Sequence, residues 1–275
     1  MFAETLKELA GTPRQKVLCE GKTVSTRMLA KGDGLGFSLS DVRLAPGMDF
    51  TLWYKHHWEA NYIVAGAGSV TDLDDGRTWR LEPGLLYVAG PRDRHRMVAS
   101  ADCHIVSVFC PAIEGDEEHD ADGSYPPTGP VPAGQPKMFA RSVTELRDAG
   151  RLLSAASGSA TTLRMLTQAD DVGVTLSDVH MPAGNSNTLW YKHHWEANVV
   201  LSGRGRVDDL TTGQSWVMEP GMMYCVGPKD RHAMHAEEDI HLLSVFNPPL
   251  RGDEIHDAEG TLAASGPVPE GPKGS

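Results

Sequence analysis

Hydrophobic residues occur in short runs separated by Gly, Pro and Asp, with little helical periodicity. In the first half of the chain these runs are residues 24–30, 36–44, 49–65, 77–82, 85–90, 95–100 and 103–109. Short apolar runs at intervals of about 8–12 residues, with turn residues between them, are typical of all-β sandwiches and barrels. One short helix is predicted near the start of each half, at residues 4–9 and 143–149.

The whole pattern occurs twice, at a constant offset of 137 residues. Residues 51–61 (TLWYKHHWEAN) recur letter for letter at 188–198, and GDEEHDADG at 115–123 recurs as GDEIHDAEG at 252–260. Because no gap breaks the register, we expect two tandem domains of ordinary size, 1–137 and 138–275. The Pro- and Gly-rich stretch 120–136 is the predicted linker between them.

Composition excludes several classes of function. The net charge of −12 argues against nucleic acid and anionic membrane surfaces as partners. No run approaches the ~18 apolar residues of a membrane span, and the first residues lack an apolar signal core. The four cysteines do not recur at the repeat offset and form no C-x-x-C pair, so we expect no disulfides and a cytoplasmic protein.

Each repeat carries a glutamate and a glycine separated by six residues, then a Pro-Gly pair with a tyrosine three residues beyond it. These residues are Glu59, Gly66, Pro83-Gly84 and Tyr87, and in the second repeat Glu196, Gly203, Pro220-Gly221 and Tyr224. The pattern resembles the two-motif signature of the cupin family. It departs from that signature because tyrosine replaces the usual second-motif histidine, and because His56 and His57 lie only three and two residues before Glu59. The resemblance implies two tandem cupin barrels of the double-stranded β-helix, or jelly-roll, type.

The departures point to one branch of the cupins. The chain resembles the ectoine synthase family through five segments in matching order, GFSLSDVRLAPG (36–47), YKHHWEANYIVAGAG (54–68), EPGLLYVAGPRDRH (82–95), EEHDADGSY (117–125) and VFNPPL (245–250). That family has one cupin per chain and forms homodimers. The resemblance therefore implies a fused bicupin, with a pseudo-dimer inside one chain and further homo-oligomers left open.

The resemblance also implies a divalent metal, with Fe(II) favoured and Zn as the alternative. Its ligands would be a glutamate, a tyrosine and a histidine in each repeat, namely Glu59, Tyr87 and His95, and Glu196, Tyr224 and His232. The sequence independently places His57 and Glu59 two apart on one expected strand, and hence on one face. A buried carboxylate beside an imidazole needs a partner or a metal.

A second recurring polar set matches substrate-pocket positions of the family. Arg27 and Arg164 would bind substrate, since arginine holds a carboxylate bidentately. The expected catalytic residues are Tyr54, His57, Glu117 and His119, with Tyr191, His194, Glu254 and His256 in the second repeat. Two family positions are altered in both repeats: Thr23 and Ala160 replace a tryptophan, and Val42 and Val179 replace a threonine.

The function implied is that of a metal-dependent carbon–oxygen lyase. The family closes a ring in N-γ-acetyl-2,4-diaminobutyrate with loss of water, so we expect a small N-acylated diamino-acid-like substrate. The cupin fold hosts many chemistries, which leaves two alternatives. One is an iron dioxygenase or isomerase acting on another small metabolite, and the other is a non-catalytic bicupin that binds a small molecule.

Overall fold

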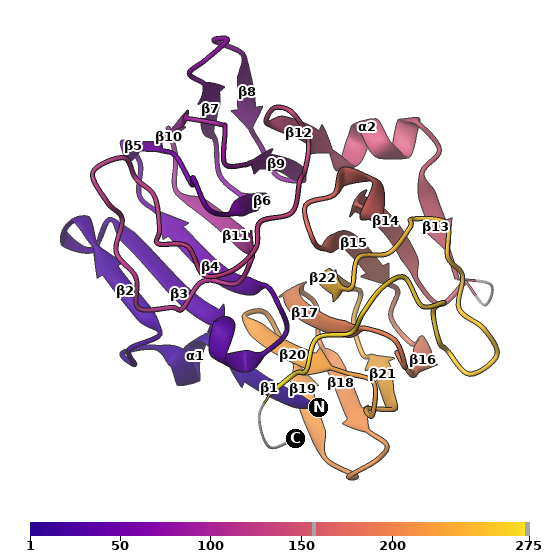
Figure 1. Ribbon diagram of the computed structural model, residues 1–275. Coiled ribbons are helices and arrows are strands. Elements are labelled where there is room, and N and C mark those ends of the chain that lie inside the picture. The colour runs from indigo at the N-terminus through magenta and orange to yellow at the C-terminus, as the bar shows by residue number, and fades with distance from the viewer. Residues whose placement is uncertain (156–157, 273–275) are drawn as a thin grey trace. The chain divides into compact units, whose positions relative to one another are not determined.

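The computed structural model describes residues 1–155 and 158–272, and the chain forms two compact units. The first barrel consists of Leu9–Thr144, and the second barrel combines Met1–Glu8 with Glu145–Ser275. Each barrel consists of a seven-stranded and a four-stranded antiparallel sheet (Figure 1). This architecture confirms the prediction of an all-β fold.

The large sheet of the first barrel has the order β12-β9-β6-β11-β4-β3-β2. Its strands are β2 (Gln15–Leu18), β3 (Thr23–Leu29), β4 (Ser38–Leu44), β6 (Trp58–Ala65), β9 (Leu85–Ala89), β11 (Cys103–Cys110) and β12 (Phe139–Ser142). The small sheet has the order β5-β10-β7-β8, with β5 (Asp49–Leu52), β7 (Gly68–Asp72), β8 (Thr78–Leu81) and β10 (His95–Ala99).

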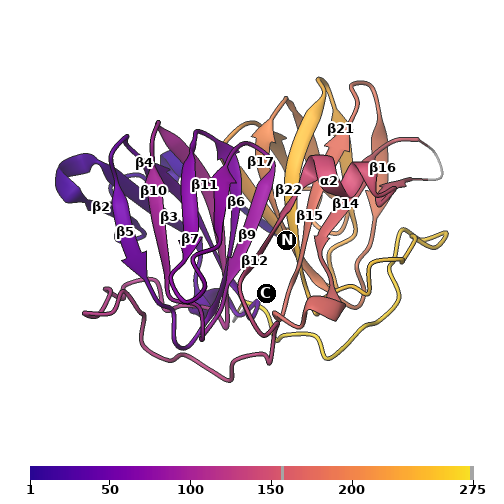
Figure 2. The ribbon, with the colours of Figure 1, turned by 90° about the horizontal axis from the view of Figure 1, so that it is seen from above.

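The second barrel repeats this order strand for strand. Its large sheet, β1-β20-β17-β22-β15-β14-β13, consists of β1 (Phe2–Thr5), β13 (Leu152–Ser154), β14 (Thr161–Leu166), β15 (Thr175–Met181), β17 (Trp195–Ser202), β20 (Met222–Val226) and β22 (Ile240–Asn247). The small sheet, β16-β21-β18-β19, consists of β16 (Ser186–Leu189), β18 (Gly205–Asp209), β19 (Ser215–Met218) and β21 (His232–Ala236) (Figure 2).

The outermost strand of each large sheet comes from the other sequence repeat. Strand β1 pairs antiparallel with β20, with Phe2 opposite Cys225, and β12 pairs with β9, with Phe139 opposite Val88. The compact units therefore divide the chain after Glu8 and after Thr144, whereas the sequence repeats divide it after Lys137.

Both predicted helices are present, at α1 (Leu6–Leu9) and α2 (Val143–Asp148). A reciprocal cap starts α1: the Thr5 backbone N–H donates to Glu8 Oε2 at 2.8 Å, and the Glu8 N–H donates to Thr5 Oγ1 at 3.2 Å. Three short 3₁₀ turns occupy Cys19–Gly21, Lys31–Asp33 and Gln168–Asp170. The apolar run 49–65 is two strands rather than one, with a turn at residues 53–57 between β5 and β6.

A steric constraint explains the glycine that ends the first motif of each repeat. Gly66 has φ +107°, and a Cβ there would lie 2.4 Å from the Asp102 carbonyl oxygen. Gly203 has φ +87°, and a Cβ there would lie 2.1 Å from the Asp239 carbonyl oxygen. Only glycine fits this close approach of the two backbones at a positive φ.

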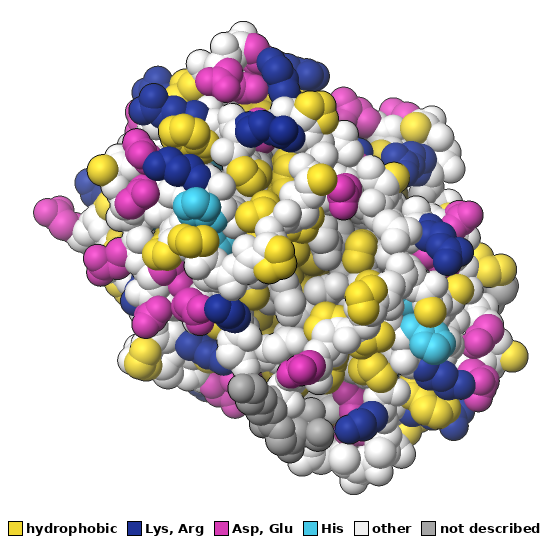
Figure 3. Space-filling view, viewed as in Figure 1, with side chains coloured by type: hydrophobic (Ala, Val, Ile, Leu, Met, Phe, Trp, Pro, Cys, Tyr) yellow, Lys and Arg dark blue, Asp and Glu magenta, His cyan; other side chains and the backbone are white. Residues whose placement is uncertain are grey.

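Apolar side chains form a core cluster between the two sheets of each barrel. In the first barrel, Ile63, Val70, Leu81 and Ile105 are fully buried in one cluster. Among the described residues there is no helix with the length and apolarity to cross a membrane. Figure 3 shows acidic and basic side chains interspersed on the face in view.

Each large sheet takes its outermost strand from the other repeat, an arrangement we call strand exchange. The oligomeric state of a fragment should therefore depend on where the chain is cut. Residues 9–144 contain all the strands of the first barrel, so this fragment should fold as a monomer. Residues 1–137 lack β12 and carry β1 without its partner. Since β1 and β12 hold equivalent places in equivalent sheets, fragment 1–137 should dimerise by pairing Phe2–Thr5 with Leu85–Ala89 of a second copy. Sedimentation equilibrium measures this, and a monomeric 1–137 as stable as 9–144 would contradict it.

Candidate functional site

A cavity of about 390 Å³ opens within the first barrel. Strands of both sheets and the irregular segment after β11 contribute its walls. Six of the eight site residues predicted in this repeat line it: Arg27, Tyr54, Glu59, Tyr87, Glu117 and His119. The structure thus brings together residues that are up to 92 positions apart in the sequence.

The predicted metal ligands converge from the two sheets. Glu59 on β6 and Tyr87 on β9 share the inner face of the large sheet, because Tyr87 pairs with Asn61, two residues beyond Glu59. His95 begins β10 of the small sheet, and its Nε2 lies 3.8 Å from Glu59 Oε2. The ring of Tyr87 meets the ring of His95 edge-on, with centroids 6.1 Å apart.

The same ligand set recurs in the second barrel. Glu196 and Tyr224 lie on β17 and β20, with Tyr224 opposite Asn198, and His232 begins β21. The Tyr224 hydroxyl donates to the thioether sulfur of Met234 at 3.2 Å, which is a weak acceptor.

Burial controls the protonation of these groups. It raises the pKa of the Glu59 carboxyl to about 8 and that of Glu196 to about 7. It lowers the pKa of His232 to about 4 and shifts that of His95 in the same direction, so both imidazoles are neutral, the form that binds metals. The pKa values of Tyr87 and Tyr224 are raised, first by burial and then by the nearby glutamate.

These residues fit a divalent metal. Glu59 Oε2, His95 Nε2 and His232 Nε2 are buried and have no hydrogen-bond partner within residues 1–155 and 158–272. A buried polar atom without a partner is costly, and a cation beside it would remove that cost. A carboxylate, an imidazole and a phenolate are all donors that Fe(II) or Zn accepts.

Arg27 lies at the centre of a buried polar network. Its guanidinium donates to Ser25 Oγ at 2.9 Å, to Ser40 Oγ at 3.1 Å and to the Tyr125 hydroxyl at 2.9 Å. The Glu117 carboxylate lies 3.6 Å away and accepts from the Gly115 N–H at 2.6 Å. The arginine charge is thus partly balanced while its Nε, with no partner among the described residues, remains available.

Tyr54 and His119 form a hydrogen-bonded pair in the cavity wall. The Tyr54 hydroxyl lies 2.9 Å from His119 Nε2, and the Tyr191 hydroxyl lies 3.1 Å from His256 Nε2. Burial, aided by the nearby arginine, lowers the pKa of both histidines to about 4. Burial also raises the pKa of Tyr54 and Tyr191, so each pair is neutral near pH 7.

His57 differs from its expected setting. The sequence predicts that His57 shares a strand with Glu59, but β6 begins only at Trp58. His57 lies in the preceding turn, where its backbone N–H donates to the Tyr54 carbonyl at 3.4 Å. His57 Nε2 lies 3.1 Å from Thr128 Oγ1, and His194 Nε2 lies 3.0 Å from Ser265 Oγ. His57 is fully buried but is absent from the cavity lining, so its catalytic role stays a prediction.

Sequence reasoning missed Tyr125. Tyr125 is buried, but the second repeat has Leu262 at the equivalent position. Comparison of the two repeats therefore does not identify Tyr125 as a site residue. In the first barrel it bonds Arg27 and stacks on His119, with ring centroids 4.3 Å apart. In the second barrel, Arg164 donates to Ser177 Oγ at 3.1 Å, and its Nε has no partner among the described residues.

The segment expected to be a linker packs on its own barrel. The Trp58 indole N–H donates to the Pro132 carbonyl at 3.0 Å, and the Trp195 indole donates to the Pro269 carbonyl at 3.1 Å. In Figure 2 both segments run as long irregular stretches along their barrels. This packing brings Tyr125 into the cavity lining and Thr128 into contact with His57.

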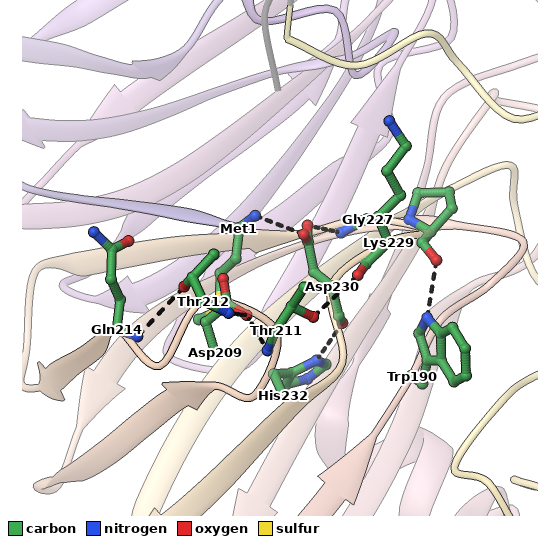
Figure 4. A network of polar contacts seen from close by, with 11 residues as sticks. Met1, Trp190, Asp209, Thr211, Thr212, Gln214, Gly227, Lys229, Asp230 and His232 are labelled. Atoms are coloured by element: carbon green, nitrogen blue, oxygen red, sulfur yellow. Dashed lines mark hydrogen bonds and ion pairs between the residues drawn. The ribbon is translucent and has the colours of Figure 1, made fainter.

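The start of the chain lies beside the candidate ligand His232. The Met1 amino nitrogen is 2.7 Å from Asp230 Oδ1, and the Gly227 N–H donates to Asp230 Oδ2 at 2.8 Å (Figure 4). His232 Nδ1 lies 3.3 Å from the Asp230 carbonyl oxygen. If Nδ1 carries the proton and donates there, Nε2 is left free to bind a metal.

The sequence profile of ectoine synthase matches residues 1–129 and again 138–265. The chain belongs to the ectoine synthase family. The L-ectoine synthase of Desulfosudis oleivorans is 42% identical over 126 residues, which are 46% of this chain and 96% of that protein. The L-ectoine synthase of Halomonas elongata is 37% identical over 127 residues, which are 46% of this chain and 93% of that protein. This chain is a duplicated member, and each relative corresponds to one repeat.

Solved structures confirm the cupin fold. The oxalate decarboxylase of Lactobacillus farciminis has a TM-score of 0.66 at 14% identity, covering 90% of this chain and 86% of that chain. A cupin 2 barrel protein from Leptotrichia buccalis has a TM-score of 0.55 at 13% identity, covering 89% of this chain and 95% of that chain. At these identities the likeness concerns the fold alone. The family relatives, which are L-ectoine synthases, support an enzyme of ectoine-synthase-like type.

The raised carboxyl pKa values predict how the metal-free protein responds to pH. A carboxyl whose pKa is about 8 when folded and about 4.5 when unfolded stabilises the fold fully below pH 4.5. This stabilisation is lost as pH rises toward 8, at about 1.4 kcal/mol per pKa unit. The buried histidines act in the opposite direction near pH 6.5, because the unfolded chain binds protons there that the folded chain does not. Chelator-treated protein should therefore lose stability between pH 6.5 and 8.5, in urea unfolding, relative to a variant without the two carboxyl groups.

The matched control is the double variant Glu59→Gln with Glu196→Gln, whose neutral amides cannot ionise. Over the same pH range its stability should stay level or rise, because only the histidines of the unfolded chain lose protons. An equal fall in the variant and the original chain would show that other groups titrate.

Proposed function

We propose that both barrels are metal-dependent carbon–oxygen lyases that close a ring with loss of water. The proposed substrate is a small N-acylated diamino acid of the N-γ-acetyl-2,4-diaminobutyrate type. The observation that carries the proposal is the repeated convergence, in two barrels, of one buried Glu–Tyr–His set with one arginine and one Tyr–His pair. Family membership supports the reaction class.

Glu59, Tyr87 and His95 would hold the metal in the first barrel, and Glu196, Tyr224 and His232 in the second. A bound divalent metal supplies Lewis acidity for an amide carbonyl. Three protein ligands leave coordination positions open for the substrate oxygen. The desolvated carboxyl favours this arrangement, because a cation beside it stabilises the ionised form.

Arg27 and Arg164 would bind the substrate carboxylate. Both side chains are buried, so an ion pair with substrate would be screened little by water. In the first barrel, Ser25, Ser40 and Tyr125 fix the guanidinium plane. A fixed plane orients the substrate so that its amine approaches its own acyl carbonyl, and this proximity lowers the barrier to ring closure.

The Tyr54–His119 pair is suited to moving a proton. The neutral imidazole can accept a proton through the Tyr54 hydroxyl as the amine nitrogen bonds to the carbonyl carbon. The carbonyl oxygen leaves as water after gaining two protons, both released by the substrate nitrogens as the C–N bond forms, becomes C=N and the C–O bond breaks. The pair can carry the first of these protons from the amine to the oxygen. Tyr191 and His256 would do the same in the second barrel.

The size of the cavity suits a small ligand. Its volume of about 390 Å³ is near the lower end of the range for ligand pockets. Thr23 and Val42, which replace a tryptophan and a threonine of the family, line it directly. A smaller residue at the tryptophan position widens the pocket there, so we propose that an acyl group larger than acetyl is accepted.

The first test is metal content together with turnover of N-γ-acetyl-2,4-diaminobutyrate and of its longer-chain N-acyl analogues. About two metals per chain at the two Glu–Tyr–His sets, and a product lighter by one water, are expected. Chelation should abolish turnover, and added Fe(II) or Zn should restore it. Ligand binding without any product would favour the non-catalytic alternative, and oxygen uptake during turnover would favour the dioxygenase.

Substituting the arginines separates substrate binding from chemistry. The double variant Arg27→Met with Arg164→Met removes the charged hydrogen bonds to a carboxylate, worth about 1.5–3 kcal/mol. KM should rise by roughly tenfold to 100-fold, with a smaller change in kcat. The control is His56→Gln with His193→Gln, at half-buried positions outside the proposed machinery. An unchanged KM in the arginine variant would contradict the assignment.

A further inference from the structure

A second group of metal-binding side chains lies in the second barrel, away from the Glu–Tyr–His set. Asp178 and His180 are two residues apart on β15, and His180 pairs directly with His241 on β22. Val179, between them, packs against the core, so Asp178 and His180 lie on the outer face of the large sheet. This group is therefore independent of the proposed active site.

The three side chains are arranged around one carboxylate. Asp178 Oδ1 lies 3.0 Å from His180 Nε2, and Asp178 Oδ2 lies 2.7 Å from His241 Nε2. The two imidazole rings stack in near-parallel planes, with centroids 4.1 Å apart and 13° between them. One donor atom from each residue lies within 4.8 Å of the others. Since zinc binds nitrogen and carboxylate oxygen at about 2 Å, small side-chain rotations suffice to enclose an ion.

The first barrel supplies an internal comparison. Its equivalent residues are Asp41, Arg43 and His104, so arginine occupies the place of His180. Arg43 Nε donates to Asp41 Oδ1 at 2.9 Å, and His104 Nε2 lies 2.5 Å from Asp41 Oδ2. A guanidinium is always charged and offers no lone pair, so it balances the carboxylate but cannot bind a metal. The second barrel has an imidazole in place of this built-in cation.

We propose that Asp178, His180 and His241 bind a divalent transition metal of the zinc class on the second barrel only. Two imidazoles and one carboxylate form a donor set that zinc, nickel and copper accept and that magnesium and calcium disfavour. The His180 side chain is 41% exposed and that of His241 23%, so water can complete the coordination. A bound ion clamps β15 to β22 and stabilises the second barrel.

The test counts zinc equivalents bound by the full chain, by titration against a chromophoric chelator of micromolar affinity. His180→Arg recreates the arrangement of the first barrel, so this variant should fold and bind one equivalent fewer than the original chain. Arg43→His creates the second-barrel arrangement in the first and should bind one equivalent more. Because all three chains keep the Glu–Tyr–His sets, the differences report this site alone.

His235→Gln is the control for loss of a surface histidine. His235 lies 3.1 Å from Asp208 but lacks a third donor in the described part of the chain, so its substitution should leave the zinc count unchanged. Equal counts for the original chain and His180→Arg would overturn the proposal. Loss of one equivalent in both His180→Arg and His235→Gln would also overturn it, because the binding would then be nonspecific.

Discussion

The structure of each site depends on the burial of one carboxyl group. Glu59 and Glu196 lie between two sheets, where an ionised carboxylate without a cation is unfavourable. Burial raises the pKa of Glu59 to about 8 and that of Glu196 to about 7, so without a cation the Glu59 carboxyl is mostly protonated at pH 7 and the Glu196 carboxyl about half protonated. A metal would reverse this preference by binding the ionised form. Each barrel thus holds a carboxyl group that a cation would complete, and this connects the fold to the proposed reaction.

The exchange of terminal strands changes what counts as one domain. Strand β1 completes the large sheet of the second barrel, and Asp230, which contacts the Met1 amino group, lies two residues before His232. The first residues of the chain therefore lie beside the segment that carries His232. In a fused chain this contact is intramolecular, so linkage keeps the exchanged strand at high effective concentration.

The sequence was most informative where a residue has a single physical reason to be present. Gly66 and Gly203 mark a close backbone approach that no other residue allows, so the motif they end predicted the barrel correctly. The reciprocal Thr5–Glu8 cap explains why the first of the two predicted helices starts where it does. The run 49–65 was misleading because the turn at residues 53–57 contains none of the usual turn residues, Gly, Pro, Asp, Asn or Ser. No local signal therefore marked the break between the two strands.

Agreement between the two repeats identified the site residues that both barrels share, but not the functional residues that occur in one barrel only. Six predicted residues line the first cavity, and all recur in the second repeat. Tyr125 and His180 each occur in one repeat only, so a search for recurring residues discards both. Yet Tyr125 holds Arg27 in the first barrel, and His180 replaces a permanent cation in the second. Once a duplicated chain has two sites, either copy can change around an unchanged donor set without loss of the original function. The positions that differ are therefore where we expect the two barrels to have acquired separate properties.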